Sequence, residues 1–256
     1  MPKTIVVNAT AANTGGALTI LLDFLSAIEE QDKSLDNNKY IIFTSVELGY
    51  APSPCIEIIN FGKKRYFQRF IWDYIGFDRF LRRERITPDL IISFQNTGVK
   101  YSKHCPQLIY FHNPFSLLPE KWNPFVRNER LLWFYTFVYP FFVKALITKN
   151  TTIVVQAEWI KKSFSKKFTF SEKNIHVIKP DVIGLPTTKD LSIDETHKLY
   201  YFFPSTAFKY KNHELIFSIL DEIEKIEPDV LKNITINLTL TFEDIEKLDL
   251  IQQYNK

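Results

Sequence analysis

Cysteine is scarce in this sequence of 256 residues, and the two that are present, Cys55 and Cys105, cannot form a disulfide framework. They also leave no CxxC pair of the kind that holds zinc. The apolar run that follows Met1 is too short for a signal peptide. We therefore expect a protein of a reducing, cytoplasmic compartment.

Glycine is scarce as well, with only seven residues, so each glycine is expected where the backbone needs it. P-loop, HExxH and GxSxG motifs are all absent from the sequence. The sequence also has no Asp-x-Asp pair, which argues against a site that holds a divalent metal between two carboxylates. Because the net charge is only +3, a groove for nucleic acid is not expected.

Charge is unevenly spread along the chain. Residues 1–182 contain 24 basic and 16 acidic residues, whereas residues 183–256 contain 8 and 13. A Pro/Thr-rich stretch over residues 179–188 lies at the change and is typical of a linker. We expect a first domain over residues 1–182, a linker over residues 183–197 and a short second domain over residues 198–256.

Short β-branched runs alternate with amphipathic segments in the first domain, which predicts βαβ units and a mostly parallel, doubly wound sheet. The predicted strands cover residues 4–7, 39–44, 56–61, 90–93, 107–111, 152–156 and 175–178. The predicted helices cover residues 15–32, 64–85 and 158–167. After the linker the pattern restarts with a strand over 198–203, a helix over 212–226, a strand over 234–240 and a helix from Glu243. The fold class expected is therefore α/β, with a Rossmann-like domain followed by an incomplete second Rossmann-like domain.

Two segments of the first domain are unusual. The predicted helix over residues 64–85 is basic, and its apolar face is expected to contain Phe67, Phe70, Ile71, Tyr74, Ile75 and Leu81. Its charges indicate either a solvated face or attraction to an anionic membrane surface. The segment over residues 131–147 approaches the length of a membrane span, but Pro140 and Lys144 interrupt it. It is interpreted as a helix that is buried against the sheet or lies in a membrane interface.

Two loops that lead from a strand into a helix have the chemistry of phosphate sites. Gly15 and Gly16 stand at a predicted helix start, where exposed N–H groups favour a phosphate, although a tight turn also explains the pair. Lys209 and Lys211 precede the helix that Asn212 is expected to cap. Two lysines beside a helix N-terminus suit a diphosphate, and a solvated basic loop is the alternative.

Polar residues also follow two neighbouring strands of the first domain. His112 and Asn113 come directly after the strand over residues 107–111, and Gln95 and Asn96 follow the preceding strand. Ligands of open α/β sheets bind beyond the carboxyl ends of the strands, so these side chains are candidates for ligand contacts. A structural role for His112 is the alternative.

Five stretches occur in an order that resembles the bacterial group-4 glycosyltransferases, which are retaining enzymes of the GT-B fold. They are Thr14-Gly15-Gly16, Gln107 to Phe115 with His112 inside it, Val154 to Lys162, Val177 to Pro180 and Tyr201 to His213. The resemblance covers nearly the whole chain. It implies two Rossmann-like domains, of which the first binds mainly the acceptor and the second mainly a nucleotide-sugar.

The resemblance also implies roles for the candidate residues. His112 would hydrogen-bond the donor sugar beside the reacting carbon, and Lys211 would neutralise the leaving diphosphate. Ser205 stands where the family often has an arginine, so the diphosphate clamp is expected to be weaker or differently built. The donor-side candidates are Gly15, Gly16, Ser205, Lys209 and Lys211, and the acceptor-side candidates are Gln95, Asn96 and Asn113. The resemblance implies a reaction that is independent of metal, in agreement with the missing Asp-x-Asp pair. The nucleotide-sugar is a substrate, so no cofactor is expected either.

The sequence departs from the family in its last part. Family members continue further and carry there a pair of glutamates with seven residues between them. Glu214 and Glu222 have this spacing, but they directly follow Lys211 and are interpreted as a coincidence. We expect a truncated transferase for a polysaccharide or lipid-linked glycan, peripheral at the inner membrane face and poorly active alone. The alternative is a non-catalytic module that binds a glycan, a lipid carrier or a partner chain that completes the second domain.

Overall fold

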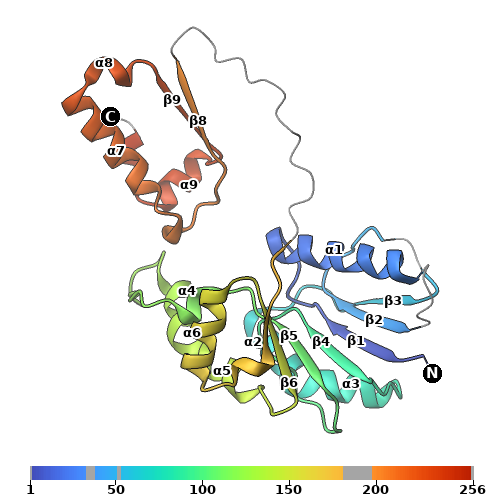
Figure 1. The fold of residues 1–256 in the computed structure, drawn as a ribbon. Coiled ribbons are helices and arrows are strands. Elements are labelled where there is room, and N and C mark those ends of the chain that lie inside the picture. The colour runs from blue at the N-terminus through green and yellow to red at the C-terminus, as the bar shows by residue number, and fades with distance from the viewer. Residues whose placement is uncertain (1, 33–37, 51–52, 181–197, 255–256) are drawn as a thin grey trace. The chain divides into compact units, whose positions relative to one another are not determined.

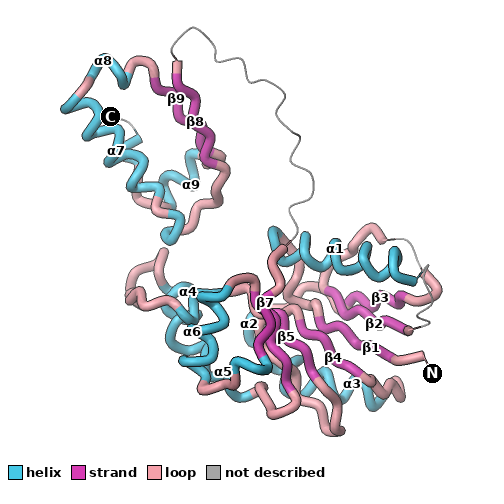
Figure 2. Tube along the Cα trace, in the orientation of Figure 1, coloured by secondary structure: helices cyan, strands magenta, loops and turns pink. Residues whose placement is uncertain are grey.

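Seven parallel strands form the main sheet of the computed structural model, which describes residues 2–32, 38–50, 53–180 and 198–254. The strand order is β3-β2-β1-β4-β5-β6-β7, and Figure 2 shows these strands side by side. Their bounds are Thr4–Asn8 (β1), Lys39–Thr44 (β2), Ile56–Asn60 (β3), Leu90–Ser93 (β4), Gln107–Tyr110 (β5), Thr151–Val155 (β6) and Ile175–Val177 (β7). The α/β class and the parallel sheet predicted from the sequence are therefore confirmed.

The chain divides into two compact units. One comprises Met1–Glu120 and Tyr135–Asp181, and the other comprises Lys121–Phe134 and Val182–Lys256. The segment Lys121–Phe134 thus groups with the second unit although it lies between β5 and β6 in sequence. The linker expected over residues 183–197 lies outside the described residues.

Helices cover both faces of the main sheet (Figure 1). The helix α1 (Gly15–Asp32) packs through Leu21 and Leu25 on one face, and α3 (Phe77–Arg83) packs through Phe77 and Leu81 on the other. The remaining helices of this unit are α2 (Tyr66–Ile71), α5 (Tyr139–Ala145) and α6 (Glu158–Phe168). Alternate residues of the strands supply both cores, as expected for a sheet that is covered on two sides.

The predicted helix over residues 64–85 is present but differs from the prediction in two ways. It runs from α2 to α3 through a π-helical turn, Trp72–Gly76 (η1), whose wider spacing turns both Trp72 and Asp73 into the interior. The prediction of the buried face is wrong for three residues, Phe67, Ile71 and Ile75, because their side chains are exposed. The aromatic core formed by Phe43, Phe61 and Phe80 takes Trp72 and Phe77 instead.

The apolar segment over residues 131–147 forms α4 (Arg130–Trp133), a second π-helical turn (Phe134–Val138) and α5. Leu132, Thr136 and Val143 are buried, whereas Phe137 and Phe141 are exposed. Within the described part of the chain, no helix has both the length and the apolar character needed to cross a bilayer.

The second unit contains the predicted restart of the α/β pattern. A parallel pair joins β8 (Leu199–Phe203) to β9 (Ile234–Leu238), and α7 (His213–Ile226) lies between them in sequence. Short helices follow at α8 (Pro228–Leu231), α9 (Phe242–Lys247) and α10 (Ile251–Tyr254). Its core contains Ala207, Ile245, Leu248 and Leu250. The prediction that the side chain of Asn212 caps α7 is wrong. Asn212 adopts a left-handed backbone with a φ of 53°, and its side chain makes no capping hydrogen bond.

Candidate functional site

The carboxyl ends of β1, β4 and β5 bring polar groups to one edge of the main sheet. These three strands are consecutive neighbours in the sheet, and they end at Asn8, Ser93 and Tyr110. Because all three run in the same direction, the residues that follow them meet at the same edge. His112, Gln95 and Asn96, which the sequence placed at strand ends, are therefore brought together there.

Asn96 holds the backbone at His112. Its Oδ1 atom accepts hydrogen bonds from the backbone N–H groups of His112 and Asn113, at 2.7 and 2.8 Å. Its Nδ2 atom lies 3.4 Å from His112 Nε2. Asn96 has a φ of 63°, a left-handed conformation that asparagine tolerates better than most residues. The amide side chain and the left-handed backbone of Asn96 together fix the backbone position from which the side chain of His112 extends.

The surroundings of His112 favour the neutral form of its imidazole. Its ring stacks on Tyr110 with the ring centroids 5.5 Å apart. Burial lowers the pKa of His112 below its ordinary value, against an opposing interaction with the backbone of Tyr110. A neutral imidazole can donate a hydrogen bond through one nitrogen and accept one through the other.

Gln95 and Asn113 are already engaged within the protein. The side chain of Gln95 donates from Nε2 to Thr10 Oγ1 at 2.8 Å, and the backbone carbonyl oxygen of Gln95 accepts a hydrogen bond from the hydroxyl of Tyr139. The side chain of Asn113 accepts a hydrogen bond from the backbone of Phe115 and so caps a short 3-10 helix. Both side chains therefore shape the loops around His112 in this structure.

Asp73 is a buried group of this edge that the sequence reasoning missed. Its carboxylate accepts hydrogen bonds from Asn8 Nδ2 at 3.0 Å and from Thr97 Oγ1 at 3.3 Å. Asp73 thereby ties the π-helical turn to the end of β1 and to the loop that contains Asn96. Burial raises the pKa of Asp73 to about 7, although both hydrogen bonds and the charge of Arg69 act to lower it. The sequence does contain a signal for Asp73, because a carboxylate in the middle of the apolar run Ile71–Ile75 indicates a buried polar group.

The glycine pair lies at the first turn of α1, which follows β1. Gly15 has a φ of 58°, a conformation that favours glycine, so the turn itself explains this residue. A Cβ atom built on either glycine would meet no atom within 4 Å. Space is thus left open at the N-terminus of a helix of 18 residues, where N–H groups attract anions.

The second unit places the predicted lysines in different surroundings. Lys209 is half-buried and forms an ion pair with Glu214, whereas Lys211 is exposed with its Nζ atom 5.0 Å from the centre of the Tyr210 ring. Ser205 is buried, and its backbone N–H and carbonyl both bond to the hydroxyl of Thr239. Ser205 therefore fastens the end of β8 to the segment that follows β9.

His213 is a buried histidine with unsatisfied polar atoms. It is 2% exposed and stands at the start of α7, and neither ring nitrogen has a hydrogen-bond partner among the described residues. Burial lowers the pKa of His213, and the charge of Lys211 lowers it further against the effect of Asp244. Buried imidazole nitrogens without partners are uncommon and mark a place where a further polar group would be stabilising.

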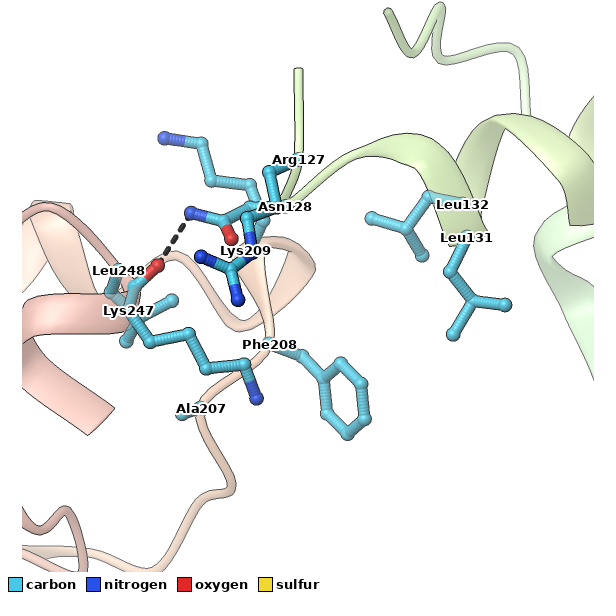
Figure 3. A pocket seen from close by; sticks show the side chains of 9 residues that line it. All are labelled: Arg127, Asn128, Leu131, Leu132, Ala207, Phe208, Lys209, Lys247 and Leu248. Atoms are coloured by element: carbon cyan, nitrogen blue, oxygen red, sulfur yellow. Dashed lines mark hydrogen bonds between the residues drawn. The ribbon is translucent and has the colours of Figure 1, made fainter. Parts of the chain in front are cut away.

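A cavity of about 250 Å³ in the second unit is shown in Figure 3. Lys209 is the only one of the predicted residues in its wall, and Arg127 and Lys247 add two further cations. Apolar side chains, including Phe208 and Leu131, form much of the remaining wall. Asn128 donates a hydrogen bond to the carbonyl oxygen of Lys247 and so joins the two sides of the cavity. The cations in the wall of this cavity suit an anionic group of a ligand, and the apolar side chains suit an apolar portion of the same ligand.

Within residues 2–32, 38–50, 53–180 and 198–254, no cluster of three or more His, Cys, Asp or Glu side chains could hold a metal ion.

Comparison with known proteins shows a similarity of fold to a solved structure. No family model and no curated protein matches the sequence. Among solved structures, a glycosyltransferase of the GT-B type is similar over 98% of this chain. It is the lipopolysaccharide outer core galactosyltransferase WaaB in its apo form, with a TM-score of 0.50, 11% sequence identity and 71% of its own length covered. At this identity the likeness shows the fold: an α/β chain of the kind found in GT-B glycosyltransferases.

Replacing Asn96 by alanine is expected to lower the free energy of unfolding by about 1–3 kcal/mol, because the N–H groups of His112 and Asn113 lose their acceptor. Urea denaturation measures the change. Asn96→Asp keeps the acceptor oxygen and is the matched control. Equal losses for the two variants would contradict the role given to Oδ1.

Proposed function

We propose that this protein is a glycosyltransferase of the group-4 type, which transfers a sugar from a nucleotide-sugar to a polysaccharide or lipid-linked glycan. The observation that supports this proposal most strongly is the position of His112. In a chain with the fold of a GT-B glycosyltransferase, His112 stands at the carboxyl end of β5 and Asn96 fixes its backbone. A protein that works in the cytoplasm, peripheral to the inner membrane face, is part of the same proposal.

The proposed role of His112 is to hydrogen-bond the donor sugar. The neutral ring can donate to a sugar hydroxyl without placing a positive charge beside a carbon that becomes electron-poor in the transition state. Asn96 acts as a positioning residue, since it sets the backbone of His112. Gly15 and Gly16 offer N–H groups to the donor, and Gln95 and Asn113 shape the acceptor side.

The proposed role of the second unit is to stabilise the diphosphate that leaves. Lys211 is exposed and carries a positive charge at the start of α7, where the helix dipole also favours an anion. His213 lies two residues further on with both ring nitrogens unpartnered among the described residues. Lys209 is the weaker candidate because Glu214 already neutralises its charge. In the proposed step the cation of Lys211 stabilises the negative charge that develops on the leaving diphosphate.

Calorimetry of the purified chain against a panel of nucleotide-sugars tests the proposal. Saturable binding of one nucleotide-sugar is expected, and Lys211→Ala is expected to weaken it at least about tenfold, which corresponds to about 1.4 kcal/mol. Lys232→Ala is the matched control, because Lys232 is an exposed lysine of the same unit that pairs with Asp229. Binding of a glycan without binding of any nucleotide-sugar would instead support a non-catalytic module.

A further inference from the structure

Buried polar side chains form a connected network at the edge of the sheet that carries His112. Asn8 Oδ1 accepts hydrogen bonds from Trp72 Nε1 at 3.2 Å and from Thr10 Oγ1 at 3.3 Å. Thr10 Oγ1 in turn accepts the hydrogen bond from Gln95 Nε2. Each of these side chains is less than a tenth exposed. The end of β1, the π-helical turn and the loop after β4 are therefore joined by hydrogen bonds that are shielded from water and strengthened by the low local dielectric.

Asp73 extends this network to the turn that contains Asn96. Its carboxylate accepts hydrogen bonds from Asn8 Nδ2 and from Thr97 Oγ1. The backbone carbonyl oxygen of Asp73 also accepts a hydrogen bond from the backbone N–H of Lys100 at 2.8 Å. The segment from Thr97 to Lys100 is therefore fastened to the π-helical turn at two points, one on the side chain of Asp73 and one on its backbone.

Asn96 is held in its left-handed conformation by contacts on both of its sides in the chain. Such a backbone costs free energy for a residue other than glycine, so the surrounding structure must maintain it. Before Asn96, the backbone carbonyl oxygen of Gln95 accepts a hydrogen bond from the hydroxyl of Tyr139 at 2.8 Å. After Asn96, the side chain of Thr97 is bonded to Asp73 and also interacts with the hydroxyl of Tyr139. The position of Asn96 thus depends on buried hydrogen bonds made by its two neighbours.

We propose that Asp73 is a positioning residue for His112. The carboxyl group of Asp73 holds Thr97, which stands next to Asn96 in the chain. Asn96 in turn sets the backbone of His112 and Asn113 through its Oδ1 atom. The proposal deepens the proposed function and rests on it for the consequence in transfer, where a misplacement of about 1 Å can cost about a hundredfold in rate.

Amide hydrogen exchange of the purified chain without substrate tests the coupling. Asp73→Ala is expected to make the N–H groups of His112 and Asn113 exchange at least about tenfold faster, while the N–H groups of β6 in the same sheet keep their rates. Asp73→Asn is expected to restore the wild-type rates, because an amide can accept from Asn8 and donate to Thr97. A rise of the same size in β6 would show a general loss of stability and overturns the positioning role.

Thr97→Val breaks the same path at its other end and is the second variant should Asp73→Ala fail to fold. It removes the hydroxyl but keeps the branched shape, and it is expected to speed exchange at the same two N–H groups. Ser102→Ala is the matched control, because Ser102 Oγ donates at 2.6 Å to Asp78, which is also a buried aspartate of this helical segment. It is expected to leave both N–H groups at the wild-type rate. Wild-type rates in the Asp73 and Thr97 variants, or an equal rise in the control, overturn the proposal.

Calorimetry separates this inference from the proposed function. Because His112 is proposed to contact the sugar and Lys211 the diphosphate, Thr97→Val is expected to weaken binding of the nucleotide-sugar at least about threefold. Binding of the corresponding nucleoside diphosphate is expected to stay unchanged. An equal loss for both ligands contradicts the positioning of His112. If the wild type binds no nucleotide-sugar, the proposed function fails, whereas the exchange rates still decide whether Asp73 positions His112.

Discussion

Raising the pH from about 4 to about 8 is expected to remove about 4 kcal/mol of the stability that a single carboxyl group, that of Asp73, contributes. Burial raises the pKa of Asp73 from 3.8 to about 7. Below the ordinary pKa both the folded and the unfolded chain hold the proton, and the contribution is fully present. As the pH rises towards about 7 the unfolded chain has already released its proton, so the contribution falls and is lost once the folded state ionises.

Asp73→Asn isolates this contribution. An amide stays neutral at every pH and can still accept from Asn8 while its Nδ2 group donates to the hydroxyl of Thr97. Urea denaturation at a series of pH values is therefore expected to show the variant gaining stability over the wild type as the pH rises. Parallel stability profiles for the two proteins would show that Asp73 does not titrate in this way.

Asp78→Asn is the matched control, because Asp78 is also a buried aspartate of the same helical segment. Burial acts against ionisation of Asp78, but hydrogen bonds from Ser102 and the charge of Arg82 outweigh it, and the pKa of Asp78 is lowered. Asp78 therefore stabilises the fold above its ordinary pKa, and this stabilisation is lost as the pH falls. The two amide variants are expected to change stability in opposite directions near neutral pH.

Replacing Phe43 by alanine is expected to lower the free energy of unfolding by about 3–5 kcal/mol. The ring is fully buried on β2 and contacts four aromatic rings, with centroids 5.2–5.8 Å away. Those neighbours are Phe61, Trp72, Phe77 and Phe80. A cavity among rigid rings closes poorly, so the loss is a large part of the roughly 5–15 kcal/mol typical of a domain.

Urea denaturation at constant pH measures this loss. Phe67→Ala removes the same ring from an exposed position and is expected to change stability by less than about 0.5 kcal/mol. Phe43→Leu keeps most of the buried volume, so its loss of unfolding free energy is expected to lie between the losses for Phe43→Ala and Phe67→Ala. Similar values for Phe43→Ala and Phe67→Ala would mean that the aromatic core is not the main support of this face of the sheet.

The strands could be predicted from the sequence because a parallel strand buried on both faces is a nearly continuous β-branched run. The bounds of β2 and β4 agree with the predicted ranges, and the other predicted strands begin and end within two residues of the observed ones. Placing His112 at the end of a strand was likewise possible, because alternation of strands and helices fixes which edge carries the loops.

The buried face of the basic helix could not be predicted in the same way. Regular helical spacing selects Ile71 and Ile75 for the core, but the π-helical turn shifts the spacing and buries Trp72 and Asp73. The carboxylate of Asp73 inside an apolar run is a local signal of a buried polar group, but the shift in spacing itself depends on how the aromatic core packs. Two tertiary details of the loop after β4 could not be predicted from the sequence either. These are the left-handed backbone of Asn96 and the close approach of Gly98, where a Cβ atom would lie 2.6 Å from the carbonyl oxygen of Leu146.

The strand order of the main sheet has a consequence for how the chain is assembled during synthesis. β1 leaves the ribosome first and occupies the third place in the order β3-β2-β1-β4-β5-β6-β7. Each later strand pairs with a neighbour that has already been made: β2 with β1, β3 with β2, and then β4 with the other side of β1, followed by β5, β6 and β7. Because synthesis proceeds from the N-terminus, this sheet can grow outward strand by strand, and no pair that has formed needs to open to admit a later one.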